Sequence, residues 1–586
     1  MNYKNLGILG GAAIAISAVV ALPVVSVLAS FFGGFGETWL HIAETALPRY
    51  VLNTAVLLAL VSFGVVSMGV VSAWLVTAYR FPGRDVLEWA LLLPLAMPAY
   101  VMAYAYTDWL QFTGAVQTAL REITRWQARE YWFPEVRSLP GAAVILSFAL
   151  YPYVYLVART AFHDLSRSAI EAGRLAGYGA LGAFFRVAVP LARPAIAAGS
   201  ALALMETLAD FGTVSYFGLE VFTTGIFKAW LSMGDSAAAA QLSSCLLGFV
   251  VVLLALERAN RGRAAYHTLA PRRARPHTLR GGRALLALAA CAAPAFFGFA
   301  LPAWLLGALA LEETVSGPRL AALMANSFSI AAITALIAVI AGVLMAYAGR
   351  LTRSPIVQFG NRVAGLGYAI PGAVIAVGVL VPLGKVDNML ASWVEAAFGV
   401  KTGLLLTGTV AALVYAYLVR LLAVSLQTTH AGLAKITPSM EDAARSLGAT
   451  PAAALARVHV PLLAPSLATA RVPVAATWGA SYDLWAPGVW GEVEDLMFES
   501  FARMGVAAEG SRDDGLSGAG RVVRQAGALR TQLKAFSGEI DSPVAYPDAE
   551  HFSESLAGLA AMLGFSPGLT DITSCQSGCF SYRART

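Results

Sequence analysis

Charged residues are scarce in this chain. Asp, Glu, Lys and Arg make up 13% of its 586 residues, while hydrophobic residues make up 58%. An ordinary soluble protein carries roughly 25% charged residues. The composition therefore excludes a disordered, fibrous or disulfide-stapled chain and indicates a polytopic membrane protein. The net charge of +6 does not indicate nucleic acid as a partner, because the cytoplasmic loops of membrane proteins are enriched in Lys and Arg.

Residues that bind metals or catalyse reactions are also few. Four cysteines are too few for a disulfide framework, and Cys245 and Cys291 lie inside apolar runs. Cys575 and Cys579 have no second pair that would complete a zinc site. The glycine-rich stretches lack the Lys-Ser/Thr ending of a phosphate-binding loop, and no Ser-His-Asp arrangement is visible. We therefore assign no metal site and expect a protein that is not an enzyme and binds no cofactor itself.

Long apolar runs, in contrast, are abundant before residue 470. A bilayer core about 30 Å thick needs about 20 apolar residues in a helix. Runs of this kind have approximate cores at 6–31, 51–78, 89–107, 141–158, 195–218, 241–256, 284–310, 327–348, 363–383 and 402–419. The first is longer than the roughly 7–15-residue core of a signal peptide, so we predict a membrane span rather than a cleaved signal. The predicted fold class is an all-α polytopic membrane protein.

Basic residues collect at alternate ends of these runs. The segment 258–283 carries eight arginines and no acidic residue. Further arginines lie near 80–84 and within 159–193, 350–362 and 420–457. Because Lys and Arg favour the cytoplasmic side, we predict that these segments and the amino terminus are cytoplasmic.

The chain contains an internal repeat. An offset of 271 aligns EAGRLAGYGALGAFFRVAVPLARPAIA, which begins at Glu171, with DAARSLGATPAAALARVHVPLLAPSLA, which begins at Asp442. Ten aligned positions are identical, including the pairs Arg174/Arg445, Gly177/Gly448, Arg186/Arg457, Pro190/Pro461 and Pro194/Pro465. Weaker matches at an offset of 273 are Asn53/Asn326 and Pro98/Pro371. We therefore predict two homologous halves of about six helices each, a plan that many transporters share.

The repeat stops near residue 470. Residues 200–258 of the first half contain two spans, whereas the corresponding stretch of the second half contains none of comparable length. Residues 471–586 hold nine basic and 14 acidic residues. The predicted divisions are a half at 1–265, an incomplete half at 266–470 with four clear spans, and a polar tail at 471–586 of uncertain origin. A frame-shift or recombination junction, a genuine soluble appendage and a divergent helix pair are the three interpretations.

Both repeated loops begin with a helix-start signal. Ser168-x-x-Glu171 and Ser439-x-x-Asp442 place a hydroxyl at the N-cap and a carboxylate three residues later. Gly177 and Gly448 then supply the residue type that adopts a left-handed conformation at a helix end. Each loop is predicted to hold a short exposed helix that contacts a partner protein or rests on the membrane. Duplication with the same spacing favours a contact with a two-fold partner.

These loops, at 160–194 and 425–465, resemble the coupling-loop motif of ABC-type import permeases. The residues that carry the resemblance are Glu171, Ala172, Gly173, Gly177 and Pro190, with their counterparts Asp442, Ala443, Ala444, Gly448 and Pro461. The family's motif begins Glu-Ala-Ala, so Gly173 and Asp442 depart from it. The resemblance implies a multi-pass protein of the bacterial inner membrane whose loops dock on a cytoplasmic ABC ATPase dimer. It also implies a periplasmic substrate-binding protein, surrounding membrane lipid, and ATP and Mg used by the partner ATPase.

The stretches METLADFGTVSYFG at 205–218 and VFTTGIFKAW at 221–230 resemble the ferric-iron subgroup, in which two permease halves are fused in one chain. This likeness implies transport of ferric iron. Permeases for thiamine, phosphonate or polyamine are alternatives within the superfamily. An ion- or proton-coupled secondary transporter is the alternative from another class, because such proteins also have duplicated halves and intramembrane acids.

Two acidic residues lie inside an apolar run. Glu206 and Asp210 are spaced i and i+4, which predicts one helical face. Hard Fe³⁺ prefers oxygen ligands, so Glu206, Asp210 and Tyr216 are candidates for the translocation path. The other interpretation is structural: the acids bond to neighbouring helices or set a gate without contacting the ion.

Overall fold

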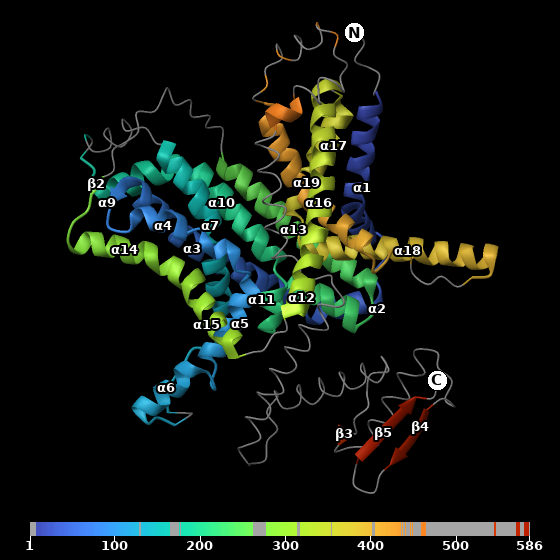
Figure 1. Ribbon diagram of the computed structural model, residues 1–586, viewed down its shortest axis with the longest axis horizontal. Coiled ribbons are helices and arrows are strands. Elements are labelled where there is room, and N and C mark those ends of the chain that lie inside the picture. The colour runs from blue at the N-terminus through green and yellow to red at the C-terminus, as the bar shows by residue number, and fades with distance from the viewer. Residues whose placement is uncertain are drawn as a thin grey trace. The chain divides into compact units, whose positions relative to one another are not determined.

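The computed structural model describes most of the chain up to residue 434 and short pieces beyond it (Figure 1). The described residues are 7–127, 130–164, 175, 177–261, 277–312, 317–352, 354–400, 405–434, 436, 440, 446, 448, 459–463, 544–545, 570–574 and 579–584. Two compact units divide the chain, residues 1–482 and 483–586. The described residues of the first unit form helices apart from one two-stranded contact, which confirms the predicted all-α class.

The described part of the first half contains five long helices and several short ones. Its elements are α1 (Ile8–Ser30), α2 (Glu37–Thr45), α3 (Leu47–Ala78), β1 (Tyr79–Arg80), α4 (Arg84–Ala90), η1 (Leu93–Ala96), α5 (Ala99–Leu110), α6 (Ala115–Thr124), α7 (Leu139–Asp164), α9 (Ala180–Ala183), η2 (Phe184–Ala188), α10 (Val189–Ala209), α11 (Gly212–Tyr216), α12 (Phe222–Phe227), η3 (Lys228–Ser232) and α13 (Ser236–Arg261). The short turns η2 and η3 are π-helical.

The second half repeats the order of the long helices. Its elements are β2 (His277–Thr278), α14 (Gly282–Ala295), the π-helical η4 (Phe296–Ala300), α15 (Leu301–Glu312), α16 (Gly317–Thr352), α17 (Pro355–Ala364), η5 (Gly367–Ala369), α18 (Gly372–Phe398) and α19 (Val410–Leu433). β1 and β2 pair in parallel, so the end of α3 is joined to the segment before α14.

Most of the predicted spans correspond to observed helices, but 89–107 and 363–383 each contain a break. Within the described part of the chain, nine helices are long and apolar enough to cross a membrane. The predicted span 89–107 is not one of these nine helices. It lies in a helix pair that is bent by 93° between Ala96 and Ala99. Pro98 stands at this break, and proline cannot donate the backbone hydrogen bond that would continue a helix. The break in the second half, between α17 and α18, contains the repeat's matching proline, Pro371.

The two halves share their local geometry as well as their order. Pro98 and Pro371 are the N-cap residues of α5 and α18, with φ of −58° in both. Gly69 of α3 packs on α7, where an added Cβ would lie 2.8 Å from Cβ of Val154. Gly342 of α16 packs in the same way on α19, 2.6 Å from Oγ of Ser425. Small residues at both positions let the helix backbones approach closely.

The first helix of each half packs against the other half. α1 contacts α16, α17 and α18, and a Cβ added at Gly378 of α18 would lie 2.5 Å from the carbonyl oxygen of Pro23. The Tyr415 hydroxyl of α19 also donates to the carbonyl of Val19, at 2.7 Å. α14 contacts α3 and α4, and Cys291 is buried in the core of the first half. The halves are therefore interlocked, because each packs its first helix against the other.

The second unit contains a small antiparallel sheet of order β3–β5–β4. Its strands are β3 (Val544–Ala545), β4 (Thr570–Ser574) and β5 (Cys579–Ala584). The remainder of residues 471–586 lies outside the described residues, so the predicted loss of the last two helices and the three interpretations of the tail stay predictions.

Candidate functional site

A buried ion pair joins the two halves inside the membrane region. Glu206 lies in the last turn of α10, and Arg420 lies in the middle of α19. Nη2 of Arg420 donates to Oε1 and Oε2 of Glu206, at 3.0 and 2.9 Å. The two side chains are 12% and 20% exposed, with arginine the more buried. Both carboxylate oxygens of Glu206 are therefore engaged by a residue of the opposite half.

Two tyrosines complete this cluster. The guanidinium of Arg420 stands 5.6 Å from the ring centre of Tyr368, in η5. Tyr368 and Tyr153 of α7 both interact electrostatically with Glu206 and Arg420. The aromatic face and the carboxylate both favour the cationic guanidinium. The cluster thus draws on α7 and α10 of one half and on η5 and α19 of the other.

The ion pair with Arg420 limits the ability of the Glu206 carboxylate to bind a cation. An isolated carboxylate in a membrane interior is costly, and a charged partner offsets that cost. Here Arg420 supplies the partner, so the pair is neutral as a whole. A cation would have to displace Arg420 before both Glu206 oxygens could bind it. The geometry favours the structural interpretation of Glu206, a contact that holds α10 against α19.

The prediction that Glu206 and Asp210 share a helical face is wrong. α10 ends at Ala209, and Asp210 has an extended ψ of 126°. Its Oδ1 accepts the backbone N–H of Val214 at 3.1 Å, and its Oδ2 accepts the hydroxyl of Thr213 at 3.0 Å. Asp competes for nearby backbone donors and so favours a helix start over a helix interior. Asp210 therefore lies just before α11, where its side chain accepts hydrogen bonds from the first turn of that helix, and does not continue α10.

The structure also separates Tyr216 from the ion pair. The Tyr216 hydroxyl accepts a hydrogen bond from Nη2 of Arg137, at 3.4 Å. The same guanidinium lies 4.9 Å from the centre of the Tyr216 ring, and Tyr104 packs edge-on at 6.3 Å. The predicted trio of Glu206, Asp210 and Tyr216 is thus divided among three separate sets of contacts.

Arg420 is the functional residue that the sequence analysis misplaced. We predicted a span ending at residue 419 and assigned Arg420 to a cytoplasmic segment, whereas α19 continues to Leu433. The available signal was the apolar sequence LLAVSL that follows Arg420. An acid inside one span predicts a basic partner inside another, and Arg420 satisfies that expectation.

The two repeated loops are described only in part. Gly177 and Gly448 both have φ of +84°, which confirms the predicted left-handed conformation. Pro190 lies in the first turn of α10, and Pro461 lies in the helical piece 459–463. The first helical piece follows the π-helical turn η2, and the second begins with π-helical His459. The other predicted loop residues lie outside the described residues: Glu171, Ala172, Gly173, Asp442, Ala443 and Ala444.

Metal-binding side chains do not gather in this region. Among the residues that the structure describes, no three His, Cys, Asp or Glu side chains are placed so that they could hold a metal ion. Cys245 and Cys291 are free thiols, the first half-buried and the second buried.

Two interlocked copies of one plan, each with apolar helices that can span a bilayer, define a polytopic membrane protein. Residues 65–263 match the family described as "Binding-protein-dependent transport system inner membrane component". This segment is therefore an ABC permease domain of that family, which confirms the resemblance found in the sequence.

Individual relatives agree with this assignment. The chain is 25% identical over 426 residues to the Fe(3+)-transport system permease protein FbpB 2 of Haemophilus influenzae, covering 71% of this chain and 76% of that protein. It is 29% identical over 184 residues to the sulfate transport system permease protein CysT of Salmonella typhimurium, covering 30% and 63%. It is 25% identical over 182 residues to the molybdenum transport system permease protein ModB of Escherichia coli, covering 30% and 76%.

Among solved structures, the chain has a weak likeness to a bacterial alginate ABC transporter in complex with an alginate pentasaccharide-bound periplasmic protein. The TM-score is 0.34 and the identity 16%, over 41% of this chain and 88% of that one.

Proposed function

We propose that this chain is the transmembrane permease subunit of an ABC importer that translocates ferric iron across the bacterial inner membrane. ATP hydrolysis is performed by a separate cytoplasmic ATPase dimer, which uses ATP and Mg, and a periplasmic binding protein delivers the substrate. The long match to a relative named for Fe(3+) transport supports iron, because it extends over both halves of the chain. The matches to relatives named for sulfate and molybdenum transport are shorter and support the class alone.

The observation that carries the proposal is the repeated turn at Gly177 and Gly448. The two glycines have the same φ of +84°, are exposed, and precede helical segments that contain the same Val-Pro dipeptide, Val189-Pro190 and Val460-Pro461. An ATPase dimer has two equivalent docking sites, so its partner must present two equivalent surfaces. A secondary transporter has no use for such a pair. The coupling role of Glu171 and Asp442 within these loops belongs to the proposal.

The ion pair supplies the second element of the mechanism. When the ATPase subunits close on nucleotide, the two loops move with them and the halves change their relative placement. Glu206 and Arg420 join those halves, so their contact is part of what distinguishes one transport state from the other. Nucleotide binding drives transport only through its differential affinity for the two states. Asp210 and Tyr216 then remain candidates for the path as two separate positions.

Coupling is tested by reversing the charge of the loop acids. The variant Glu171→Arg/Asp442→Arg should lose co-purification with the ATPase subunits of the same transporter and lose stimulation of their ATP hydrolysis. Glu37→Arg is the matched control, because Glu37 is an exposed acid in the first turn of α2, at the end of the span opposite to the predicted cytoplasmic side. Full co-purification of the loop variant would contradict the coupling role.

The substrate is tested by uptake of radioactive Fe³⁺ into cells that contain the chain, the binding protein and the ATPase. Uptake should require all three components. Competition with excess sulfate, molybdate, thiamine, phosphonate or polyamine should leave Fe³⁺ uptake unchanged. Iron uptake that persists without the ATPase would support a secondary transporter, and uptake of one of the competitors in place of iron would reassign the substrate.

A further inference from the structure

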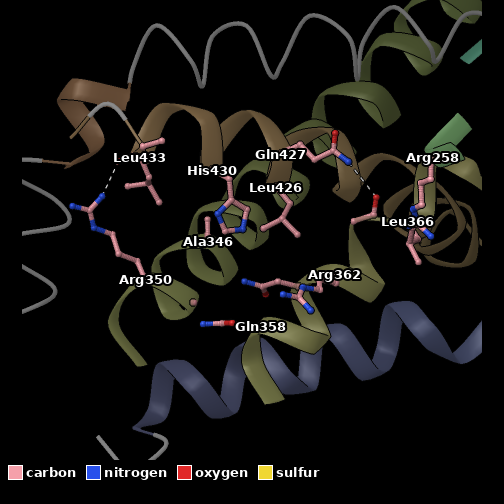
Figure 2. A pocket seen from close by; sticks show the side chains of 14 residues that line it. Arg258, Ala346, Arg350, Gln358, Arg362, Leu366, Leu426, Gln427, His430 and Leu433 are labelled. Atoms are coloured by element: carbon pink, nitrogen blue, oxygen red, sulfur yellow. Dashed lines mark hydrogen bonds between the residues drawn. The ribbon is translucent and has the colours of Figure 1, made fainter. Parts of the chain in front are cut away.

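A cavity of about 730 Å³ lies between α16, α17 and α19, near the end of α13 (Figure 2). This volume falls within the roughly 300–1,000 Å³ of small-molecule sites. The charged side chains in its wall are Arg258, Arg350 and Arg362, and His430 adds an imidazole. No carboxylate is found among the described residues that line it. The charged side chains among these described lining residues are therefore all basic.

The arginines are distributed along the cavity. In Figure 2, Arg350 and Arg258 lie toward opposite sides of the view, with His430 and Arg362 between them. Arg350 donates to the carbonyls of Leu433 and Ile436, at 2.7 and 2.9 Å, so it is fixed at the carboxyl end of α19. Arg362 is exposed and is held in the last turn of α17. Arg350 is thus held in place by backbone carbonyls, whereas Arg362 remains accessible to a ligand.

The rest of the wall combines apolar residues with the amide side chains of Gln358, Asn361 and Gln427. Leu366, Leu426 and Leu433 line the cavity together with alanines and glycines. A surface that combines arginines with leucines matches an amphiphile that has an anionic head and a hydrocarbon part. Each of the three arginines belongs to a segment that we predict to lie at the cytoplasmic end of its helix. Basic pockets between membrane helices on that side bind phosphate headgroups.

The corresponding place in the first half is filled. Glu88, which the repeat aligns with Asn361, forms ion pairs with Arg159 and, at 3.8 Å, with Arg84. The hydroxyl of Tyr155 also donates to the carbonyl of Glu88, at 2.9 Å.

The second half has lost each of these filling groups. Asn361 replaces Glu88, Leu426 replaces Tyr155 and His430 replaces Arg159, and all three replacements line the cavity. The cavity therefore lies at a place where the side chains of the two halves differ.

We propose that this cavity binds a phosphate group, carried by an anionic phospholipid of the inner leaflet or by a free phosphate. The negative charge interacts with Arg362 and its neighbours, and the apolar part of the wall accommodates the hydrocarbon part of a lipid. The tests below measure binding of lipid or phosphate and not transport. Their outcome therefore does not depend on which substrate the chain transports.

The first test is native mass spectrometry of the full chain extracted from membranes that contain phosphatidylglycerol and phosphatidylethanolamine. The wild-type protein should retain phosphatidylglycerol. The variant Arg258→Gln/Arg362→Gln should retain less, by roughly fivefold for each arginine removed. The control Arg280→Gln/Arg283→Gln removes the same charge from exposed residues outside the cavity and should bind as the wild type does. Equal retention in the cavity variant and the control would overturn a lipid site.

The second test uses inorganic phosphate, to learn whether the cavity binds a free phosphate ion or only the headgroup of a lipid. After complete delipidation, phosphate should raise the melting temperature of the wild type and leave that of Arg258→Gln/Arg362→Gln unchanged if the site accepts a free anion. Stabilisation by phosphate without retention of phosphatidylglycerol would assign the free anion. Absence of both effects would overturn the proposal.

A filling variant tests the cavity without removing its arginines. Asn361→Glu/Leu426→Tyr/His430→Arg installs the side chains of the first half, where this combination packs in a matching framework. The added acid balances the added base. The variant should lose the bound phosphate group while its monodisperse elution is retained. Retention of the phosphate group by this folded variant would also overturn the site.

Discussion

The two halves of the chain use ion pairs differently. The first half pairs Glu88 with Arg84 and Arg159, all within α4 and α7. The second half directs Arg420 out of α19 to Glu206 of the first half. An internal pair fixes the packing of one half in every state of the transporter. A pair between halves instead depends on their relative placement, so the comparison separates contacts that stabilise a half from contacts that report its motion.

Removing Arg420 should have the largest effect. Arg420→Met leaves the Glu206 carboxylate buried without its cationic partner, which should cost roughly 3–5 kcal/mol. We expect a large loss of monodisperse protein in size-exclusion chromatography and a lower melting temperature. In Glu206→Gln/Arg420→Met no charge remains, so much of the stability should return. A double variant as unstable as Arg420→Met would show that the ion pair is not the cause.

The internal pair provides the matched contrast. Glu88→Gln/Arg159→Met should fold, at a cost below that of removing one partner, and should keep the transport rate per folded molecule. Glu206→Gln/Arg420→Met should fold as well but change the ATP-dependent transport rate, because it removes a contact between the halves. Thermal unfolding and uptake into proteoliposomes measure the two properties separately. Equal transport by both double variants would remove the distinction between internal and connecting pairs.

The glycines that join the long helices should have intermediate effects. Ala at Gly69 would place Cβ 2.8 Å from Val154 Cβ and 2.9 Å from the backbone nitrogen of Tyr155, so α3 and α7 must separate. Gly342→Ala meets Ser425 and Leu426 of α19 in the same manner. Overpacking of this kind costs typically 1–3 kcal/mol.

The control for these variants is Gly248→Ala of α13, where no atom lies within 4 Å of the added Cβ. The melting temperatures of Gly69→Ala and Gly342→Ala should fall by similar amounts, and that of the control should not fall. A fall in only one would indicate that the halves do not pack alike.

Much of the membrane fold could be predicted from the sequence, because length and apolar composition suffice to place a span. Pro98 and Pro371 were visible as a repeated pair, but the sequence analysis placed both inside continuous spans and did not predict the breaks at them. The packing of α1 and α14 on opposite halves was not predictable, since it depends on contacts between distant segments. The end of α10 at Ala209 was missed because a periodic apolar run outweighed the preference of Asp210 for a helix start.

The candidate site was predictable only in part, for a related reason. The membrane acid Glu206 was identified from its surroundings, but its partner was not, because a single arginine near the end of a predicted span has the appearance of a loop residue. The cavity beside Arg350 and Arg362 was also missed. It arises from the absence of filling side chains, which becomes visible only when the second half is compared with the first in three dimensions.

The turns at Gly177 and Gly448 should have the smallest effect on stability and a distinct effect on coupling. Both have φ of +84° with no atom within 4 Å of an added Cβ, so alanine meets no clash and only the backbone is strained. A left-handed conformation costs a non-glycine residue roughly 1–2 kcal/mol. In Gly177→Ala/Gly448→Ala the turns should therefore relax and displace the loops that precede them. The melting temperature should change little, whereas ATPase stimulation should fall.

Gly179→Ala is the control for these turns, because Gly179 is equally open and does not have a left-handed backbone. Since the two turns match, Gly177→Ala and Gly448→Ala should each reduce ATPase stimulation by a similar factor. A large loss from one and none from the other would indicate that only one half transmits the motion of the ATPase, and the comparison of the halves would then extend from the membrane to the coupling loops.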